Sequence, residues 1–161
     1  FHVFGQGKAE FADLSNAVAG LNALAICQSC FTTNLSEGLC SICANPQRRK
    51  DLVAIVEKET DLISLEKAKK FDGRYLVLGE LKKDGFLTNV QKLRLRTIKN
   101  AEEAILAMNP TTYGDINATL IAQELRESVK KITRLGRGIP TGGEIEFADE
   151  ETLASAIQNR S

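Results

Sequence analysis

The stretch that decides the architecture runs from residue 27 to residue 56 and reads CQSCFTTNLSEGLCSICANPQRRKDLVAIV. It holds four cysteines within 17 positions, as two C-x2-C pairs separated by nine residues. Each C-x2-C pair places two thiolates on one tight turn, and two such turns supply the tetrahedral four-sulfur set that zinc prefers. The sequence therefore predicts a metal site whose ligands are Cys27, Cys30, Cys40 and Cys43.

Two other interpretations of the cysteines stay open at the level of sequence. Four sulfurs in tetrahedral geometry also suit iron, as in a small electron carrier, and four cysteines can form two disulfides. We favour zinc because nothing in the sequence indicates an oxidising compartment. A site with four protein ligands leaves no position for water, so we expect the metal to be structural. Residues 26–44 offer few apolar side chains, so metal binding is expected to replace a hydrophobic core there.

Beyond the cysteines, short apolar runs alternate with helical patterns. Residues 52–56 form a β-rich apolar run typical of a strand buried on both faces. Strands that alternate with helices favour a mostly parallel sheet with helices on both sides, which is an α/β fold. We predict further strands at 75–78, 104–108 and 131–135, and helices near 60–68, 88–98 and 117–129.

The two ends of the chain are predicted to add smaller elements. Residues 10–24 carry apolar side chains at helical spacing, which predicts an amphipathic helix before the first cysteine. The glycine-rich stretch 136–143 lacks the Gly-Lys-Ser/Thr ending of a P-loop, so we interpret it as a flexible connection. Residues 144–149 alternate like an edge strand, and Asp149 is expected to cap a short final helix.

The composition limits the functions that the chain can have. The 161 residues are enough for one substantial domain, or a domain with a small satellite. The single histidine, His2, argues against histidine-based acid–base or triad chemistry. No apolar run reaches the roughly 20 residues that cross a bilayer, and the start does not resemble a signal peptide. We therefore expect no membrane contact and a cytoplasmic location.

The net charge of the chain does not indicate nucleic-acid binding. The 21 basic and 21 acidic residues give a formal net charge of zero, whereas phosphate neutralisation favours a basic chain. Any contact with DNA must then come from a local basic cluster. The candidate is the turn Arg48-Arg49-Lys50, although such a triplet is often only a solvated turn.

Acidic side chains follow the predicted strands. Glu57 comes directly after the first strand, Asp61 lies one helical turn further on, and Asp115 follows the third strand. Ligands of open parallel sheets gather at the carboxyl ends of the strands, where carboxylates can hold Mg²⁺ against phosphate. The simpler alternative is that these acids are solvated or cap helices. Tyr113 weakens the magnesium interpretation, because a phenol is a poor Mg²⁺ ligand.

Several motifs in the same order resemble the bacterial RecR family of recombination mediators. The resemblance runs from about residue 21 to residue 161. Its anchors are the four cysteines with Cys-Ser-Ile-Cys as the second pair, Asn45-Pro46, Ile55-Val56-Glu57, residues 75–79, residues 108–111, and the long block 137–149 that is followed by Thr152-Leu153.

The resemblance implies a zinc finger followed by a Toprim domain. The corresponding divisions are a trailing N-terminal helix at 1–24, the zinc finger at 25–51, the Toprim domain at 52–135 and a C-terminal segment with a Walker-B-like stretch at 136–161. The family's N-terminal helix-hairpin-helix, which contacts DNA, has no counterpart before residue 24. We therefore expect DNA binding by this chain to be weakened. A ring-like homo-oligomer, a dimer or tetramer with exchanged C-terminal segments, is also implied.

The resemblance also implies a role without chemistry. A protein of this family acts with RecO or RecF at single-stranded gaps and helps to load RecA onto DNA covered by single-strand-binding protein. Glu57 and Asp61, with which we group Asp115, would then form a RecO-facing surface. The alternative is a Mg²⁺-dependent phosphoryl-transfer enzyme, such as a nuclease or primase, because Toprim folds also serve those reactions. Tyr113 and the lack of a partner domain for such chemistry favour the non-enzymatic role.

Overall fold

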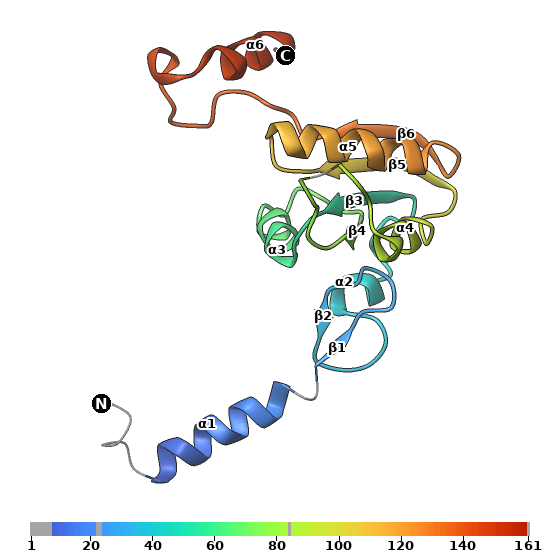
Figure 1. Cartoon of the computed structure of the whole chain (residues 1–161), viewed down its shortest axis with the longest axis vertical. Coiled ribbons are helices and arrows are strands. Elements are labelled where there is room, and N and C mark those ends of the chain that lie inside the picture. The colour runs from blue at the N-terminus through green and yellow to red at the C-terminus, as the bar shows by residue number, and fades with distance from the viewer. Residues whose placement is uncertain (1–7, 22–23, 84, 161) are drawn as a thin grey trace.

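The computed structural model describes residues 8–21, 24–83 and 85–160, with side chains from residue 11 onward. A four-stranded parallel sheet of order β4-β3-β5-β6 forms the centre of the molecule (Figure 1). The prediction of an α/β fold with a parallel sheet is therefore confirmed. The strands are β3 (Leu52–Val56), β4 (Arg74–Val77), β5 (Ala101–Ala107) and β6 (Val129–Arg134).

The inner strand β3 shows why the sheet needs cover on both faces. All five of its residues are buried. Successive strand side chains point to opposite faces, so Val53 and Ile55 join one core cluster while Ala54 and Val56 join another. This double burial explains the uninterrupted apolar run that predicted the strand.

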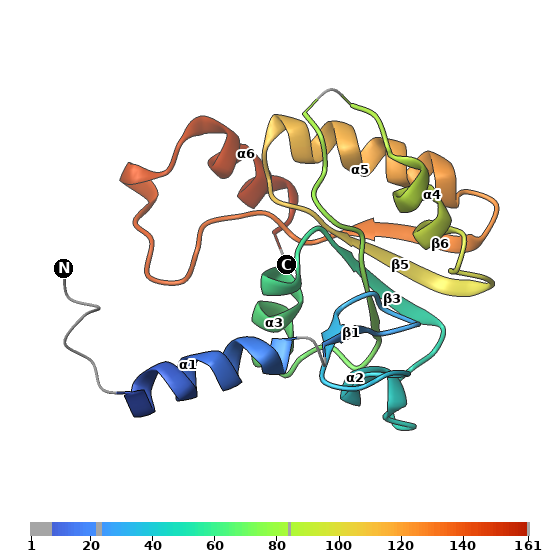
Figure 2. The ribbon, with the colours of Figure 1, turned by 60° about the horizontal axis from the view of Figure 1, so that its bottom comes forward.

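Helices supply the cover on each face of the sheet (Figure 2). Helices α4 (Asn89–Leu95) and α5 (Thr112–Leu125) pack on one face, where Leu95, Ile121 and Leu125 are almost fully buried. Helix α3 (Glu59–Lys67) packs on the other face through Leu62.

The four cysteines lie in a small lobe, here called the cysteine lobe and comprising residues 25–50. It contains the antiparallel pair β1 (Ala25–Ile26) and β2 (Thr33–Asn34) and the single turn α2 (Ser41–Ala44). The lobe lies against the outer edge of the sheet, where the N–H of Val77 in β4 donates to the carbonyl of Cys30 at 2.8 Å. Figure 1 shows the lobe below the sheet.

Local caps move several helix boundaries away from the sequence prediction. Helix α5 begins at Thr112, five residues before its predicted start, because the hydroxyl of Thr111 accepts from the N–H of Gly114 at 3.1 Å. The same helix ends at Leu125 and not at residue 129, which leaves Val129 to begin β6. Thr88 and Gln91 form a capping box at the start of α4, because the N–H of Gln91 donates to the Thr88 hydroxyl and the N–H of Thr88 donates to the Gln91 carboxamide oxygen.

The expected edge strand at 144–149 is wrong. Ile145–Phe147 forms a short 3-10 helix, and Ile145 and Phe147 are 70% and 79% exposed. An alternating pattern forms a strand only beside a partner strand, and the described residues provide none for this segment. Helix α6 (Glu150–Gln158) follows, and Asp149 caps it by accepting from the N–H of Thr152 at 2.9 Å, as predicted.

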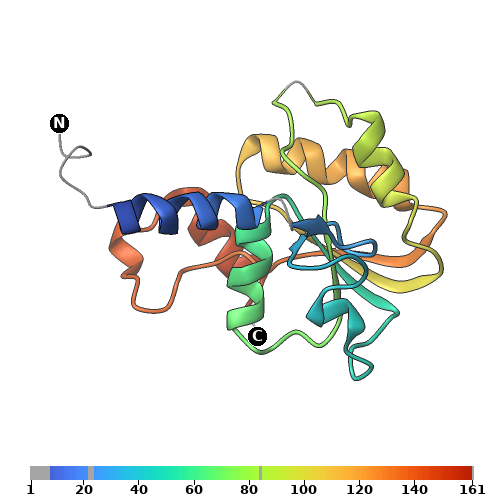
Figure 3. The ribbon, with the colours of Figure 1, turned by 90° about the horizontal axis from the view of Figure 1, so that it is seen from below.

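The N-terminal helix α1 (Lys8–Gly20) confirms the helical pattern predicted before the first cysteine. Its described side chains, at 11–20, are all exposed. Figures 1 and 3 show α1 extending out from the lobe, so that α1 does not help to cover the sheet. His2 lies outside the described residues. Within the described part of the chain, no helix has both the length and the apolar character that a membrane span requires.

Candidate functional site

The four cysteines meet in one buried cluster. Their exposed fractions run from 0% at Cys27 to 6% at Cys40, and their sulfur atoms all lie within 4.8 Å of one another. All four thiols are free, so the disulfide alternative is not what the structure contains. Across residues 8–21, 24–83 and 85–160, no other group of His, Cys, Asp or Glu side chains approaches in this way. A closed set of four sulfurs can hold one metal ion but leaves no ligand position for a substrate.

The four sulfurs do not ionise alike: the pKa is lowered at Cys27 and Cys43 and raised at Cys30 and Cys40. The N–H of Cys40 donates to the sulfur of Cys27 at 3.3 Å, and the sulfurs of Cys30 and Cys40 lie 3.6 Å apart. A hydrogen bond from the Cys30 thiol lowers the pKa of Cys43 to about 5, and the same pairing raises the pKa of Cys30. The cluster is thus arranged for thiolates that share one cation, because a metal ion would take the place of the shared protons.

Side chains from distant parts of the chain fasten the lobe to the sheet. Arg48, whose side chain is 13% exposed, donates to the carbonyls of Phe71 and Gly73 at 3.2 and 3.1 Å and pairs with Glu66. A Cβ atom at Gly73 would lie 2.5 Å from the carbonyl oxygen of Leu52, so this turn accepts only glycine.

Two further contacts strengthen the same junction. The N–H and hydroxyl of Thr33 both donate to Glu59 at the start of α3, at 2.9 and 2.7 Å. The guanidinium of Arg94 lies 4.9 Å from the ring centroid of Phe31, in a cation–π contact, and donates to the carbonyl of Val77 at 3.0 Å. The sequence did not single out these two pairs, because Thr33 and Glu59, like Phe31 and Arg94, are far apart along the chain.

The predicted basic turn is divided among three different roles. Arg48 belongs to the junction and points into the protein. Arg49 pairs with Asp51 at 2.9 Å on the surface, which raises the pKa of Arg49 and lowers the pKa of Asp51. Lys50 is exposed and lines a cavity. Of the three candidates for phosphate contact, Lys50 is therefore the one whose charge has no partner among the described residues.

The three predicted acids do not gather into a ligand set. Glu57 accepts from the N–H of Leu81 at 3.1 Å. Asp61 lies in the first turn of α3 and accepts from the N–H of Lys58 at 3.0 Å, so it supports the helix start. Because each acid has a local partner and none belongs to a group with metal-ligand spacing, the arrangement gives no support to a magnesium centre.

Asp115 is the most strongly engaged of the three acids. It lies in the first turn of α5, not in a loop, and pairs with Arg137 and, at 3.1 Å, with Arg134. Arg137 holds the pKa of the Asp115 carboxyl below its usual value. Asp115 thus connects α5 to the stretch 136–143.

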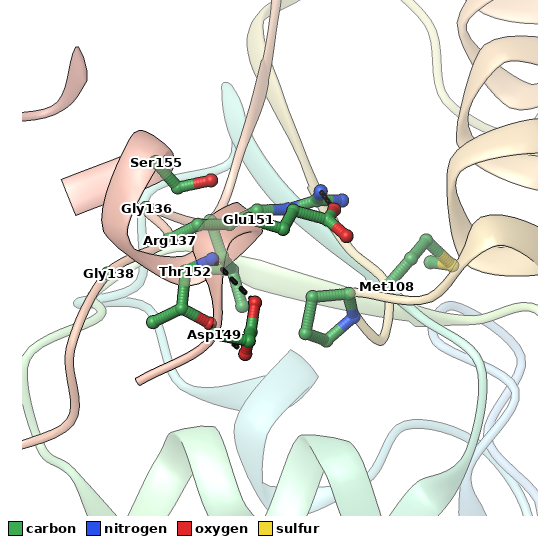
Figure 4. A pocket seen from close by; sticks show the side chains of 10 residues that line it. Met108, Gly136, Arg137, Gly138, Asp149, Glu151, Thr152 and Ser155 are labelled. Atoms are coloured by element: carbon green, nitrogen blue, oxygen red, sulfur yellow. Dashed lines mark hydrogen bonds and ion pairs between the residues drawn. The ribbon is translucent and has the colours of Figure 1, made fainter. Parts of the chain in front are cut away.

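A cavity of about 350 Å³ lies where the C-terminal segment meets the end of β5 (Figure 4). Met108 and Pro110 line it from the loop that follows β5, and Asp149 and Glu151 line it from α6 and its cap. Arg137 also lines it and pairs with Glu151 at 3.7 Å. Most of its polar lining groups are occupied by these internal contacts. We therefore interpret the cavity as part of the contact between the C-terminal segment and the rest of the protein.

Comparison with known proteins gives two regional matches. Residues 51–136 match the Toprim domain, and residues 138–161 match the family described as "RecR, C-terminal". These regions adjoin the cysteine lobe and together account for the sheet and the C-terminal segment.

Relatives of similar length extend the match to the lobe and to α1. The chain is 34% identical to the recombination protein RecR of Clostridium perfringens, over 99% of this chain and 83% of the relative. The RecR of Trichormus variabilis is 36% identical, over 99% of this chain and 89% of the relative. The RecR of Thermus thermophilus is 37% identical, over 95% and 80%. With the Toprim and C-terminal matches in the same order along the chain, this protein belongs to the RecR family.

Proposed function

We propose that this chain is a non-enzymatic mediator of recombinational DNA repair, which helps to load RecA at single-stranded gaps together with RecO- and RecF-type partners. The family membership supports a role in recombination. The proposal that the chain is not an enzyme rests on the chemistry of the sulfur cluster and of the acids at the sheet edge. The sulfur cluster is closed, and the acids at the sheet edge are occupied by local partners.

The metal in this proposal is zinc with a structural role. Four buried sulfurs within 4.8 Å suit zinc, and the lobe buries little else. Elemental analysis of the purified protein should find one zinc per chain. A coloured protein that contains iron would contradict the assignment and would favour an electron carrier instead.

The acidic rim formed by Glu57, Asp61 and Asp115 is proposed as the docking surface for a RecO-type protein. Glu57 is the partly exposed member whose side chain makes one backbone contact, so its replacement disturbs the fold least. We expect Glu57→Ala to weaken binding of RecO in a calorimetric titration by several-fold. Glu127→Ala, which removes one exposed acid after α5, is the matched control. Equal affinity of the two variants would remove Glu57 from the docking surface.

Assembly of several copies of the chain belongs to the same proposal. Ile145, Phe147 and Ile157 in the C-terminal segment are at least 63% exposed, and a second copy of the chain that covered them would remove this apolar surface from water. The mass in solution should correspond to a dimer or tetramer. We expect the protein to act in the cytoplasm, where its DNA and protein partners are.

The decisive experiment measures function directly. The protein, with RecO, is added to gapped DNA covered by single-strand-binding protein, and the rate of RecA filament formation is followed. We expect faster loading than without the protein, and no change in DNA length when Mg²⁺ or Mn²⁺ is present. Cleavage or synthesis of DNA would instead support the alternative of a Mg²⁺-dependent phosphoryl-transfer enzyme.

A further inference from the structure

A second cavity, of about 460 Å³, lies at the opposite end of the strands from the acidic rim. It opens where the first cysteine turn meets the amino ends of β4, β3 and β5. Here it is called the junction cavity. The polar lining residues that matter come from four separate segments: Gln28, Ser29, Lys50, Arg74, Thr97 and Lys99.

The charge of the junction cavity is uniformly positive. Lys50, Arg74 and Lys99 line it, and no acidic residue does. In the described part of the chain none of these three side chains makes an ion pair or hydrogen bond. Three acids on neighbouring segments are already paired elsewhere, namely Asp51 with Arg49, Glu102 with Lys130 and Glu103 with Lys131, and Asp72 lines a different cavity. Three unneutralised cations around one cavity focus a positive potential inside it.

Arg74 gives an independent indication of a missing partner. Its Nε–H group is fully buried and has no hydrogen-bond acceptor. Buried donors in folded proteins nearly always have an acceptor. A donor without one has lost its hydrogen bonds to water on folding and has formed none in the protein. As the first residue of β4, Arg74 is held in place by the pairing of that strand with Val53 in β3. An acceptor that enters the cavity would satisfy this group without moving the backbone.

The other polar lining groups define the kind of acceptor. The side-chain carboxamide of Gln28 makes no hydrogen bond among the described residues and can donate, whereas the Thr97 hydroxyl already donates to the carbonyl of Arg94 at 2.7 Å. The one ring among the lining residues, Tyr75, is only 2% exposed and offers no face for a base to stack on. The cavity therefore presents donors and positive charge without a platform for bases. Such a site suits phosphate groups in a manner independent of sequence.

We propose that the junction cavity is a phosphate-binding site that takes the phosphodiester backbone of a single DNA strand through Lys50, Arg74 and Lys99. Only the identity of the ligand as DNA rests on the proposed repair function. The proposal keeps Lys50 from the basic turn, adds two cations from other segments and leaves out Arg48 and Arg49, which are engaged elsewhere.

The test measures binding of a fluorescently labelled oligothymidylate to the full chain at several salt concentrations. The variants are Lys50→Gln, Lys99→Gln and the double substitution. The matched control is Lys82→Gln, which removes one exposed charge in the loop after the carboxyl end of β4. Among the described residues, the side chains of these lysines make no hydrogen bond or ion pair, and thermal unfolding of each variant checks that the fold is retained.

The expected result is a several-fold loss of affinity for each cavity variant and a loss of more than about tenfold for the double variant, with the control unchanged. The slope of log K against log salt should become shallower by about 0.7 for each phosphate contact removed. Cavity variants that bind the strand as well as the Lys82→Gln control would overturn the site while leaving the proposed function intact.

A parallel titration with inorganic pyrophosphate separates the site from the proposed function. If pyrophosphate binds and the double variant loses it while the strand does not bind at all, the assignment to DNA is overturned. If neither ligand binds the unmodified protein, the phosphate site itself is overturned. The proposal is supported in full if the double variant loses both the strand and pyrophosphate while the Lys82→Gln control binds both.

Discussion

The cysteine lobe and the parallel sheet hold their shapes by different means. One face of the sheet buries a cluster of 13 residues and the other a cluster of six, whereas the lobe buries only its four cysteines, with Ile42 packed beside them. Large side chains elsewhere in the lobe face outward, and Leu35 is 83% exposed. A segment with so little apolar burial cannot offset the entropy of folding on its own. The comparison teaches that the lobe depends on its ligand set and the sheet on its packing.

Removing the metal should separate the two regions most clearly. Binding of structural zinc contributes roughly 10–16 kcal/mol in zinc-finger peptides, which is far more than the lobe's few apolar contacts. We expect Cys43→Ser, or treatment with a strong chelator, to abolish hydrogen-exchange protection at Cys27 and Ala44 while Ile55 and Leu106 in the sheet keep theirs. Loss of protection in both regions together would show that they fold as one unit.

A substitution that creates a cavity beside the sheet should have the opposite effect, because it should destabilise the sheet and leave the metal bound. Ile121 is 0% exposed between α5 and the sheet, so Ile121→Ala should lower the free energy of unfolding by about 2–5 kcal/mol. Metal content should stay at one ion per chain. The control is Ile116→Ala in the same helix, where the side chain is 44% exposed and a change within about 0.5 kcal/mol is expected. Chemical denaturation with elemental analysis measures both quantities.

The junction provides an intermediate case that touches both regions. Arg48→Ala removes three hydrogen-bond donations and leaves the carbonyls of Phe71 and Gly73 without their partner. A loss of about 1–3 kcal/mol is expected, with exchange becoming faster on both sides of the junction. Arg49→Ala removes an equal charge from an exposed pair and should change stability much less than Arg48→Ala, because water screens that pair. If the two variants behave alike, Arg48 does not connect the lobe to the sheet.

The smallest effect concerns the C-terminal segment, which belongs to neither region. Arg137 lowers the pKa of Asp115 from 3.8, so their attraction is complete above that value and is lost as the pH falls through the lower pKa of the folded state. The amide resonance of Gly138 should report this titration in NMR spectra, with a midpoint below 3.8. In Asp115→Asn the same resonance should not titrate. A midpoint above 3.8 in the unmodified protein would mean that Arg137 does not face Asp115 in solution.

The sequence revealed the features that depend on short-range patterns. The spacing of Cys27, Cys30, Cys40 and Cys43 predicted the cluster, and the apolar run at 52–56 predicted the central strand, because both signals lie within a few residues. The capping box of Thr88 and Gln91 is another short-range feature, because the two residues are only three positions apart.

Features that depend on long-range contacts could not be read in the same way. Arg48 reaches Gly73, 25 residues away, and no local pattern distinguishes it from the exposed Arg49. In α4 the apolar Val90 and Leu93 face solvent while Gln91 is buried, because the carboxamide of Gln91 donates to the carbonyl of Glu80. The strand expected at 144–149 failed because alternation says nothing about whether a neighbouring strand exists.

The bond from Val77 to Cys30 has a consequence for how separate molecules meet. Strand β4 is the outermost on its side of the sheet, and an uncovered outer strand invites pairing with strands of other molecules. On the opposite side, β6 carries Lys130 and Lys131, and such charges discourage pairing of this edge strand with a strand of another molecule. Only the metal-dependent lobe screens β4. We therefore expect loss of the metal to turn a well-behaved protein into one that aggregates through this strand, even while its own sheet stays folded.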